Sequence, residues 1–288
     1  MTSEIKKRPA HHSHTLKLLP GYAVMVLWLL FTVVLLGWIF AASFSTTKEI
    51  NMGAVLRFES GLHFENYTAA WNSYNVSIYF MNSLIYATSA LVLIIMISAP
   101  AAYVLSRFPF PGNKLIRMCF IFAMSIPIIM VILPLFGLTT QLRLNGSRWT
   151  LIALYTMMNI PFTTTFLLNF FGSLSRTYEE AAAIDGCSPM KTFWLIMLPL
   201  AQPGIITVGI FLFLGVWNEY FMALIFAGSE NLRSVGPGLY MMVDTMTRTG
   251  KLGGLFASVV IVFLPTFLLY IFLSEKIIAG VTGGGIKG

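Results

Sequence analysis

The sequence contains few charged residues. Asp, Glu, Lys and Arg make up 10% of the 288 residues, whereas ordinary soluble domains are about a quarter charged. Hydrophobic residues make up 57%, and the mean hydropathy is +0.80. This composition excludes one or two ordinary soluble domains and indicates an integral membrane protein.

Cysteine is also scarce. Only Cys119 and Cys187 are present, one in an apolar run and one in a polar loop, which argues against a disulfide framework and a zinc cluster. His11, His12 and His14 stand in a polar N-terminal tail that we interpret as solvated, so no metal site is expected.

Six charge-poor apolar segments are long enough to cross a membrane, which takes about 20 predominantly apolar residues. They predict an all-α fold with spans at residues 21–43, 82–105, 116–138, 150–171, 202–227 and 252–274. Together the spans form one transmembrane domain, residues 21–274, between an N-terminal tail, 1–20, and a C-terminal tail, 275–288. The first apolar segment exceeds the roughly 7–15 residues of a signal peptide, so it is interpreted as a spanning helix.

An even number of spans places both termini on the same side of the membrane, and the charges of the loops indicate which side. The side of the termini holds eleven basic residues: Lys6, Lys7, Arg8, Lys17, Arg107, Lys114, Arg117, Arg176, Lys191, Lys276 and Lys287. The opposite side holds seven: Lys48, Arg57, Arg143, Arg148, Arg233, Arg248 and Lys251. Because cytoplasmic loops carry the excess of Lys and Arg, both termini are expected in the cytoplasm.

The loop at residues 172–201, between the fourth and fifth spans, has the pattern of two capped helices. Thr177 and Glu180 have the spacing of a capping box, which predicts a helix start. Gly186 follows where a left-handed residue would end that helix. Ser188-Pro189 then predicts the start of a second helix, with proline at its first position, that runs to about Leu198.

Two ordered helices exceed what a simple connection between spans requires, so the loop is interpreted as a docking site. Alanines at 181–183 leave a surface of low relief on which a partner can close. Glu179, Glu180 and Asp185 either pair with charges at the rim of that partner or only favour the helix dipole.

The spacing within this loop resembles that of permeases of binding-protein-dependent ABC importers. In that family Glu-Ala-Ala is followed, after three residues, by Gly, after nine more by Ile, and after one more by Leu-Pro. The matching positions here are Glu180-Ala181-Ala182, Gly186, Ile196 and Leu198-Pro199. Softer similarities to the carbohydrate branch, which includes maltose permeases, lie at Asn82-Ser83, Pro161-Phe162, Trp217-Asn218 and Lys287-Gly288. Leu174-Ser175-Arg176 departs from the Ile-Pro that many relatives carry, which puts the entry into the first helix in question.

The resemblance implies the type I importer permease fold and a coupling helix that rests in a cleft of a cytoplasmic ATPase. The coupling residues would be Glu179, Glu180, Ala181, Ala182, Asp185 and Gly186. The implied partners are a second, similar permease subunit, two copies of the ATPase and an external solute-binding protein, in the cytoplasmic membrane of a bacterium or archaeon. The sequence has no Gly-x4-Gly-Lys-Ser/Thr phosphate loop, so ATP and Mg would be bound by the ATPase, and this chain would perform no catalysis.

A polar cluster in the fifth span is the candidate substrate path. Polar residues at membrane depth usually face the bundle interior or a cavity. Trp217, Asn218 and Glu219 combine an aromatic face with groups that match hydroxyls, as sugar sites do. Tyr155 and Asn159 in the fourth span are weaker candidates, since neutral polar groups also join helices. Alternatively, Glu219 lies near the outer interface and Trp217 belongs to an aromatic belt.

Other functions remain open from sequence alone. A permease of an ABC importer for another polar solute is the first alternative. An ion-coupled secondary transporter would need buried carboxylates or histidines and often inverted repeats, and only Glu219 qualifies. An intramembrane enzyme would need paired catalytic groups, and the spans contain no His-Glu-x-x-His motif or Ser/His set.

Overall fold

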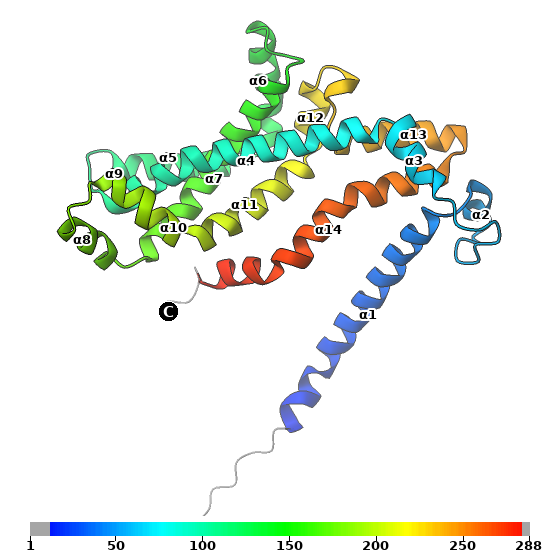
Figure 1. Ribbon diagram of the computed structural model, residues 1–288, viewed down its shortest axis with the longest axis horizontal. Helices are drawn as coiled ribbons and strands as arrows, with labels where there is room; N and C mark the ends of the chain where they lie inside the picture. Colours follow the sequence, from blue (N-terminus) through cyan, green and yellow to red (C-terminus); the bar gives the residue numbers. More distant parts are fainter. Residues whose placement is uncertain (1–11, 284–288) are drawn as a thin grey trace, which may run out of the picture.

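The computed structural model describes residues 12–283, and every regular element among them is helical (Figure 1). Residues 1–11 of the N-terminal tail, with three of its basic residues and His11, and Lys287-Gly288 at the other end lie outside the described residues. The elements in chain order are α1 His12–Ala42, α2 Thr47–Asn51, α3 Glu65–Ser73, α4 Val76–Arg107, α5 Asn113–Ser125, α6 Ile128–Gln141, α7 Arg148–Ser173, α8 Thr177–Ile184, α9 Pro189–Thr192, the π-helical η1 Phe193–Met197, α10 Leu198–Leu200, α11 Gln202–Trp217, α12 Phe221–Phe226, the 3-10 turn η2 Glu230–Leu232, α13 Val235–Thr249 and α14 Leu252–Gly283.

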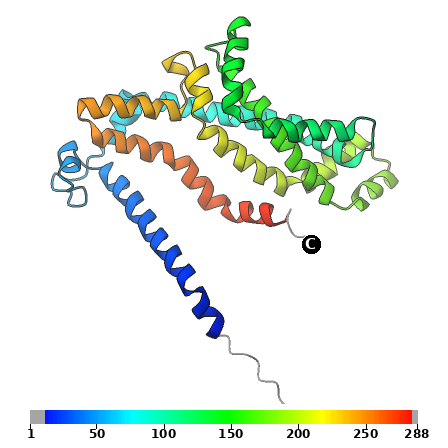
Figure 2. The ribbon, with the colours of Figure 1, turned by 180° about the vertical axis from the view of Figure 1, so that it is seen from behind.

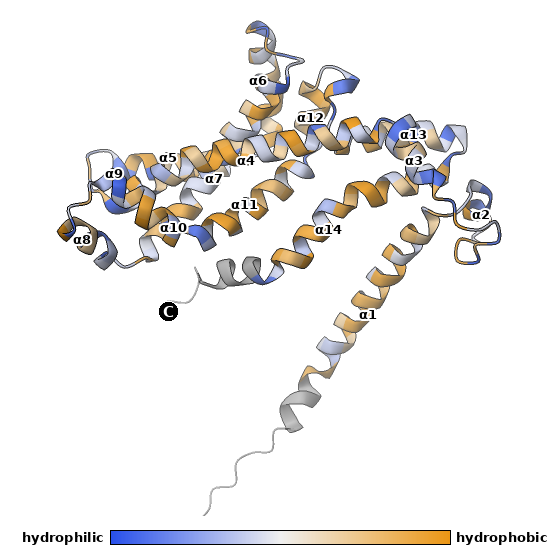
Figure 3. Ribbon diagram, viewed as in Figure 1, coloured by the Kyte–Doolittle hydropathy of each residue, from blue (hydrophilic) through white to orange (hydrophobic). Residues whose placement is uncertain are grey.

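Four helices of the described chain are each long and apolar enough to cross a membrane: α1 from residue 18, α4, α7 and α14. Two bent pairs raise the number to six if each pair counts as one span. In the first pair α5 and α6 meet at 97°, and in the second residues 189–200 and α11 meet at 70°. The helices are apolar along most of their length, and polar residues gather near α8, α9, α2 and α13 (Figure 3).

Two of the predicted spans are not continuous helices. The third breaks between α5 and α6, because Pro127 offers no backbone N–H and forces Ile126 into an extended conformation (φ −84°, ψ 116°). The fifth ends at Trp217, and a second helix starts at Phe221. The predicted spans at 116–138 and 202–227 therefore each contain a break between two helices.

The core of the chain lies between α4, α7 and α11, and α4 with α7 is the most extensively packed pair. Small residues on α4, such as Ala87, Ala90 and Ala102, allow the two helices to approach closely. Leu151 and Phe171 on α7 are fully buried in this cluster. The core therefore depends on close packing, which is the main attraction between helices in lipid.

Helix α1 stands away from the rest of the chain, as the two opposite views in Figures 1 and 2 show. Its contacts lie near its C-terminal end, where the ring of Trp38 meets that of Phe256 edge-on. Along the remainder its apolar side chains are exposed, for example Trp28 at 71%. An uncovered apolar helix of this length must contact lipid or another subunit.

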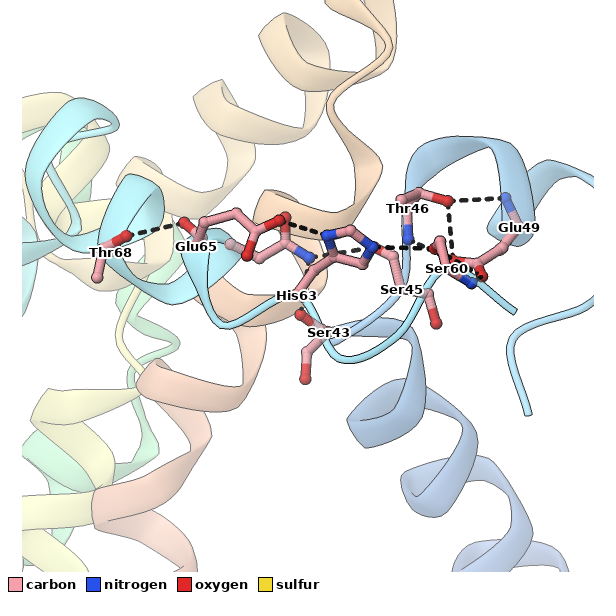
Figure 4. A network of polar contacts seen from close by, with 9 residues as sticks. Ser43, Ser45, Thr46, Glu49, Ser60, His63, Glu65 and Thr68 are labelled. Atoms are coloured by element: carbon pink, nitrogen blue, oxygen red, sulfur yellow. Dashed lines mark hydrogen bonds and ion pairs between the residues drawn. The ribbon is translucent and has the colours of Figure 1, made fainter. Parts of the chain in front are cut away.

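A network of polar side chains orders the segment between α1 and α4 (Figure 4). Glu49 is buried and accepts hydrogen bonds from the amides and hydroxyls of Thr46 and Ser60, at 2.8–2.9 Å. Thr46 and Glu49 form a capping box at the start of α2. The two backbone amides, followed by the two hydroxyls, lower the pKa of Glu49 from 4.5 to about 2.

His63 continues this network on the other side of Ser60. Its Nε2 lies 2.9 Å from Ser60 Oγ, and its Nδ1 contacts Glu65, whose pKa is lowered by this contact. The Ser60 hydroxyl donates its one hydrogen to Glu49 at 2.8 Å. The serine proton is thus held by a carboxylate, and the Ser-His-Glu chain serves to clamp the segment rather than to activate a nucleophile.

Candidate docking loop and membrane-embedded polar cluster

The first docking-loop helix, α8, begins differently from the sequence prediction. Thr177 is already helical, and Arg176 precedes the helix without a side-chain cap. The hydroxyl of Ser175 instead accepts a hydrogen bond from the Thr177 amide at 3.3 Å. The predicted capping box between Thr177 and Glu180 was therefore wrong, because the chain enters the helix one residue earlier than that pattern requires.

The end of α8 agrees with the prediction. Gly186 has φ +74°, in the left-handed region. The amide of Gly186 donates to the carbonyl of Ala183 at 3.1 Å, and the amide of Cys187 donates to that of Ala182 at 2.9 Å. These two bonds form a Schellman motif, which satisfies carbonyls that the end of the helix would otherwise leave unpaired. Gly186 thus sets the direction in which the chain leaves α8.

The second helical segment starts at the predicted cap. Ser188 is extended, its hydroxyl accepts from the Lys191 amide at 3.4 Å, and Pro189 occupies the first helical position. The segment then passes through a π-helical turn over residues 193–197 before α10. Pro199 interrupts the regular ladder because it has no N–H to donate, and this explains the widened turn before it.

The sequence analysis expected the alanines at 181–183 to give α8 an exposed face of low relief, and the exposed face differs from this. Ala182 is only 2% exposed and faces the chain's own interior. Ala181 and Ala183 are exposed, and the side chain of Ile184 is 87% exposed. A large apolar side chain that extends from a loop of small residues is a typical anchor for a partner's pocket.

The acidic residues of α8 lie in two different environments. Glu180 and Asp185 are exposed. Glu179 is half-buried, and its Oε2 lies 3.3 Å from Nε of Arg107, the last residue of α4. The sequence analysis left open whether all three pair with a partner or only favour the helix dipole, whereas the structure shows Glu179 in a contact within the chain.

Arg107 was missed by the sequence analysis, which counted it only as a basic loop residue. Its side chain is 5% exposed, and Nη2 donates to the carbonyl of Leu174 at 2.8 Å. No local pattern signals this role, since the whole of α5, α6 and α7 separates Arg107 from Glu179 in the sequence. The only hint in the sequence is that Arg107 directly follows a long apolar segment.

The polar cluster expected in the fifth span lies at the break between α11 and α12. Glu219 accepts hydrogen bonds from the amides of Met222 at 2.8 Å and Ala223 at 3.1 Å, so it caps the N-terminus of α12. Tyr155 on α7 donates its hydroxyl to Glu219 at 2.9 Å. Asn159 lies one turn farther along α7 and donates to the carbonyl of Tyr155 at 2.8 Å. The structure thus brings Tyr155 and Glu219 together, whereas the bond of the Asn159 side chain stays within α7.

Asn218 and Trp217 differ in their surroundings. Asn218 is exposed, and its amide group donates to the carbonyl of Leu214 at 2.9 Å. Trp217 is fully buried in a second apolar cluster, where its ring stacks on Phe213 and meets Phe80 edge-on. Trp217 therefore packs inside the chain and does not join the polar cluster.

Comparison with known proteins identifies a family. Residues 92–279 match the sequence profile described as the binding-protein-dependent transport system inner membrane component. The permease protein NgcG of the diacetylchitobiose uptake system of Streptomyces coelicolor is 34% identical over 93% of this chain and 88% of its own length. The trehalose/maltose transport system permease protein MalG of Thermococcus litoralis is 27% identical over the full length of both chains.

A solved structure shares the fold. It is a chain of a bacterial ABC transporter involved in the import of the acidic polysaccharide alginate, with a TM-score of 0.80 over 94% of this chain and 99% of that chain. Its sequence identity is 19%, so the likeness establishes the arrangement of the helices alone.

Proposed function

Because the chain belongs to the family of binding-protein-dependent transport system inner membrane components, we propose that it forms one half of the translocation pathway of an ATP-driven importer for a sugar or oligosaccharide. The names of its relatives, which include diacetylchitobiose and trehalose/maltose permeases, support a carbohydrate cargo. In this family the membrane chain is a transport component, and ATP and Mg belong to partner ATPase subunits. A second permease subunit and an external solute-binding protein complete the proposed assembly.

The docking loop carries this proposal. It presents a short helix whose exit is fixed by the Schellman motif at Gly186, and whose exposed face offers Ile184 between small and acidic residues. A cleft on an ATPase can take up Ile184 as an anchor, while Glu180 and Asp185 meet basic groups at its rim. ATP-driven closure of two ATPases would then displace the loop and switch the cavity from inward-facing to outward-facing.

The proposed topology has six spans, with the bent pairs counted as one span each, and both termini in the cytoplasm. The eleven-to-seven division of basic residues supports this orientation. It places the docking loop, 172–201, in the cytoplasm, and the network around Glu49 on the outer face. The transmembrane domain is then residues 21–274, with tails at 1–20 and 275–288, in a bacterial or archaeal cytoplasmic membrane.

The proposed substrate path runs past the break between α11 and α12. Asn218 is exposed there, and Asn159 lies one turn from Tyr155, so both amides are placed to meet sugar hydroxyls. The hydrogen bond from Tyr155 to Glu219 joins α7 to the segment between α11 and α12. Trp217 has a packing role in this proposal, since it is buried elsewhere.

Ion-coupled secondary transport is the competing function. Its coupling group would be Glu219, the one carboxylate expected at membrane depth. That carboxylate already accepts hydrogen bonds from one hydroxyl and two amides, and in this arrangement it stabilises the start of α12. The contacts therefore favour a structural role for Glu219 over a reversible proton or ion site.

Reconstitution tests the proposed function and separates it from the alternative. The chain is purified with its partner permease and ATPase, placed in liposomes, and offered maltose, trehalose and diacetylchitobiose, with histidine as a control solute. We expect uptake of a sugar that requires both ATP inside and the solute-binding protein outside. Uptake driven by a proton or sodium gradient without ATP would contradict the proposal.

A further inference from the structure

The inner end of α4 is joined to the docking loop by an ion pair between a buried arginine and a half-buried glutamate. Arg107, the last residue of α4, contacts Glu179 on α8 at 3.3 Å and the carbonyl of Leu174 at 2.8 Å. Four ion pairs occur among the described residues, and the other three join residues at most four positions apart. This pair alone connects two distant parts of the chain.

Aromatic packing surrounds the ion pair. The ring of Tyr103, one turn before Arg107 on α4, lies 5.6 Å from that of Phe171 and 5.1 Å from that of Phe193. A cavity of about 320 Å³ is lined by Tyr103, Arg107 and residues of α8 and α9. The last turn of α4 therefore contacts the residues that precede α8, α8 itself and the π-helical turn after α9.

At the outer end of α4, side chains of the helix are hydrogen-bonded to residues 230–235. Tyr79 donates its hydroxyl to Glu230 at 2.9 Å. Asn82 donates to the carbonyls of Asn231 at 2.7 Å and Arg233 at 3.0 Å. Two further side chains of α4 also bond to this segment. The hydroxyl of Tyr86 donates to the carbonyl of Leu232, and the hydroxyl of Ser83 accepts from the amide of Val235.

These two sets of contacts lie at opposite ends of one helix. α4 has 32 residues, which at 1.5 Å per residue gives a length of about 48 Å. It runs past Pro100 without a break and packs along α7. In Figures 1 and 2 its ends lie beside α8 and α9 on one side of the chain and beside α3 and α13 on the other.

We propose that Arg107 is a positioning residue that makes the docking loop and α4 move as one rigid body, so that a displacement of the loop by the ATPase reaches residues 230–235 at the opposite membrane face. This inference rests on the proposed function, because it presumes that an ATPase moves the loop. It adds that the displacement is transmitted through α4. Arg107 joins this helix to the docking loop, and the side chains that join it to residues 230–235 are Tyr79, Asn82, Ser83 and Tyr86.

The physical reason is the cost of separating a buried charge from its partners. Arg107 is nearly inaccessible, so a loop that moved without α4 would take the guanidinium away from the nearby Glu179 carboxylate and from its hydrogen-bond acceptor, the carbonyl of Leu174. Breaking a buried pair in this way is strongly unfavourable. A joint movement of the loop and α4 keeps the contacts intact and is therefore the path of lower energy.

A distance measurement on the complex tests the inference without changing Arg107. Ser175→Cys and Ser229→Cys place spin labels at exposed positions near the two ends of α4, with Cys119→Ser and Cys187→Ser removing the native thiols. Electron paramagnetic resonance compares the nucleotide-free complex with the complex trapped by ATP and vanadate. We expect the distance to stay within one helical turn, about 5.4 Å. A larger shift would overturn the inference.

Kinetics of the purified complex provide the second test. In Arg107→Ala we expect the ATPase to remain bound, the KM for MgATP to be unchanged, and kcat per complex to fall about tenfold. Arg107→Lys should recover part of the rate, because an ammonium group still pairs with Glu179. Arg248→Ala, which removes an exposed ion pair with Asp244, is the matched control and should behave as wild type.

A double mutant distinguishes positioning from general destabilisation. Adding Glu179→Gln to Arg107→Ala should cause no further loss, since both changes remove the same contact. Additive losses, or a wild-type kcat in Arg107→Ala, would refute the role of Arg107. Failure of the wild-type chain to bind any ATPase would instead contradict the proposed function. The two kinds of failure can therefore be told apart.

Discussion

Replacement of Gly186 is the sharpest test of the docking loop. This residue has φ +74°, where a side chain is strained, and the left-handed conformation costs a non-glycine residue about 1–2 kcal/mol. A Cβ atom built at Gly186 would meet no atom within 4 Å. The penalty of a substitution is therefore confined to the backbone, and clashes with neighbouring groups add nothing to it.

The expected magnitude follows from this penalty. A loss of one to two kcal/mol lowers the population of the native loop by a factor of about 5–30. We expect Gly186→Val to fall in this range, both in ATPase retained on purification and in sugar uptake, and Gly186→Asn to lose less because asparagine tolerates left-handed backbone. Glu180→Gln should be milder than Gly186→Val, since an exposed ion pair contributes only about 0–1 kcal/mol.

The matched control is Gly172→Val at the end of α7. A Cβ atom there also meets nothing within 4 Å, but the backbone is helical and φ is not positive. This variant should insert and transport as wild type does. Wild-type docking and uptake in Gly186→Val would refute the reasoning and reduce the loop to a simple connection.

Three further predictions concern other parts of the chain. Ala182→Asp should destabilise the loop itself by burying an unpaired carboxylate, whereas Ala181→Asp on the exposed face should be tolerated by the fold; limited proteolysis of the loop compares them. The pKa of Glu49 is lowered on folding. The ionised Glu49 therefore contributes fully to the stability of the folded state above pH 4.5, and this contribution is lost as the pH falls through about 2. Protection of the Ser60 amide from hydrogen exchange should accordingly persist at pH 4 and be lost in Glu49→Gln; equal protection in both would contradict this. Ser175→Cys, in a background without native cysteines, should resist an impermeant thiol reagent outside intact cells, and rapid labelling would overturn the topology.

Parts of the docking loop could be predicted because they depend on neighbouring residues. The Schellman motif needs a residue that adopts positive φ, and Gly186 supplies it within the same few residues that form the helix. The cap at Ser188-Pro189 is local in the same way. The start of α8 was predicted wrongly, since the same sequence is compatible with two registers of the cap, and Ser175 rather than Thr177 accepts the amide.

The sequence by itself determined that the chain is an integral membrane protein, which segments are apolar enough to span, where the loop with two short helices lies and which family the chain resembles. All of these follow from composition and from patterns within a few residues. The tertiary structure alone decided that Ala182 faces inward, that Trp217 packs away from the polar cluster, and that Arg107 pairs with Glu179. Arg107 and Glu179 are 72 positions apart in the chain, and the other two features depend on which face of a helix meets a neighbour. No local pattern specifies such contacts, because they arise only when α4, α7 and α11 pack together.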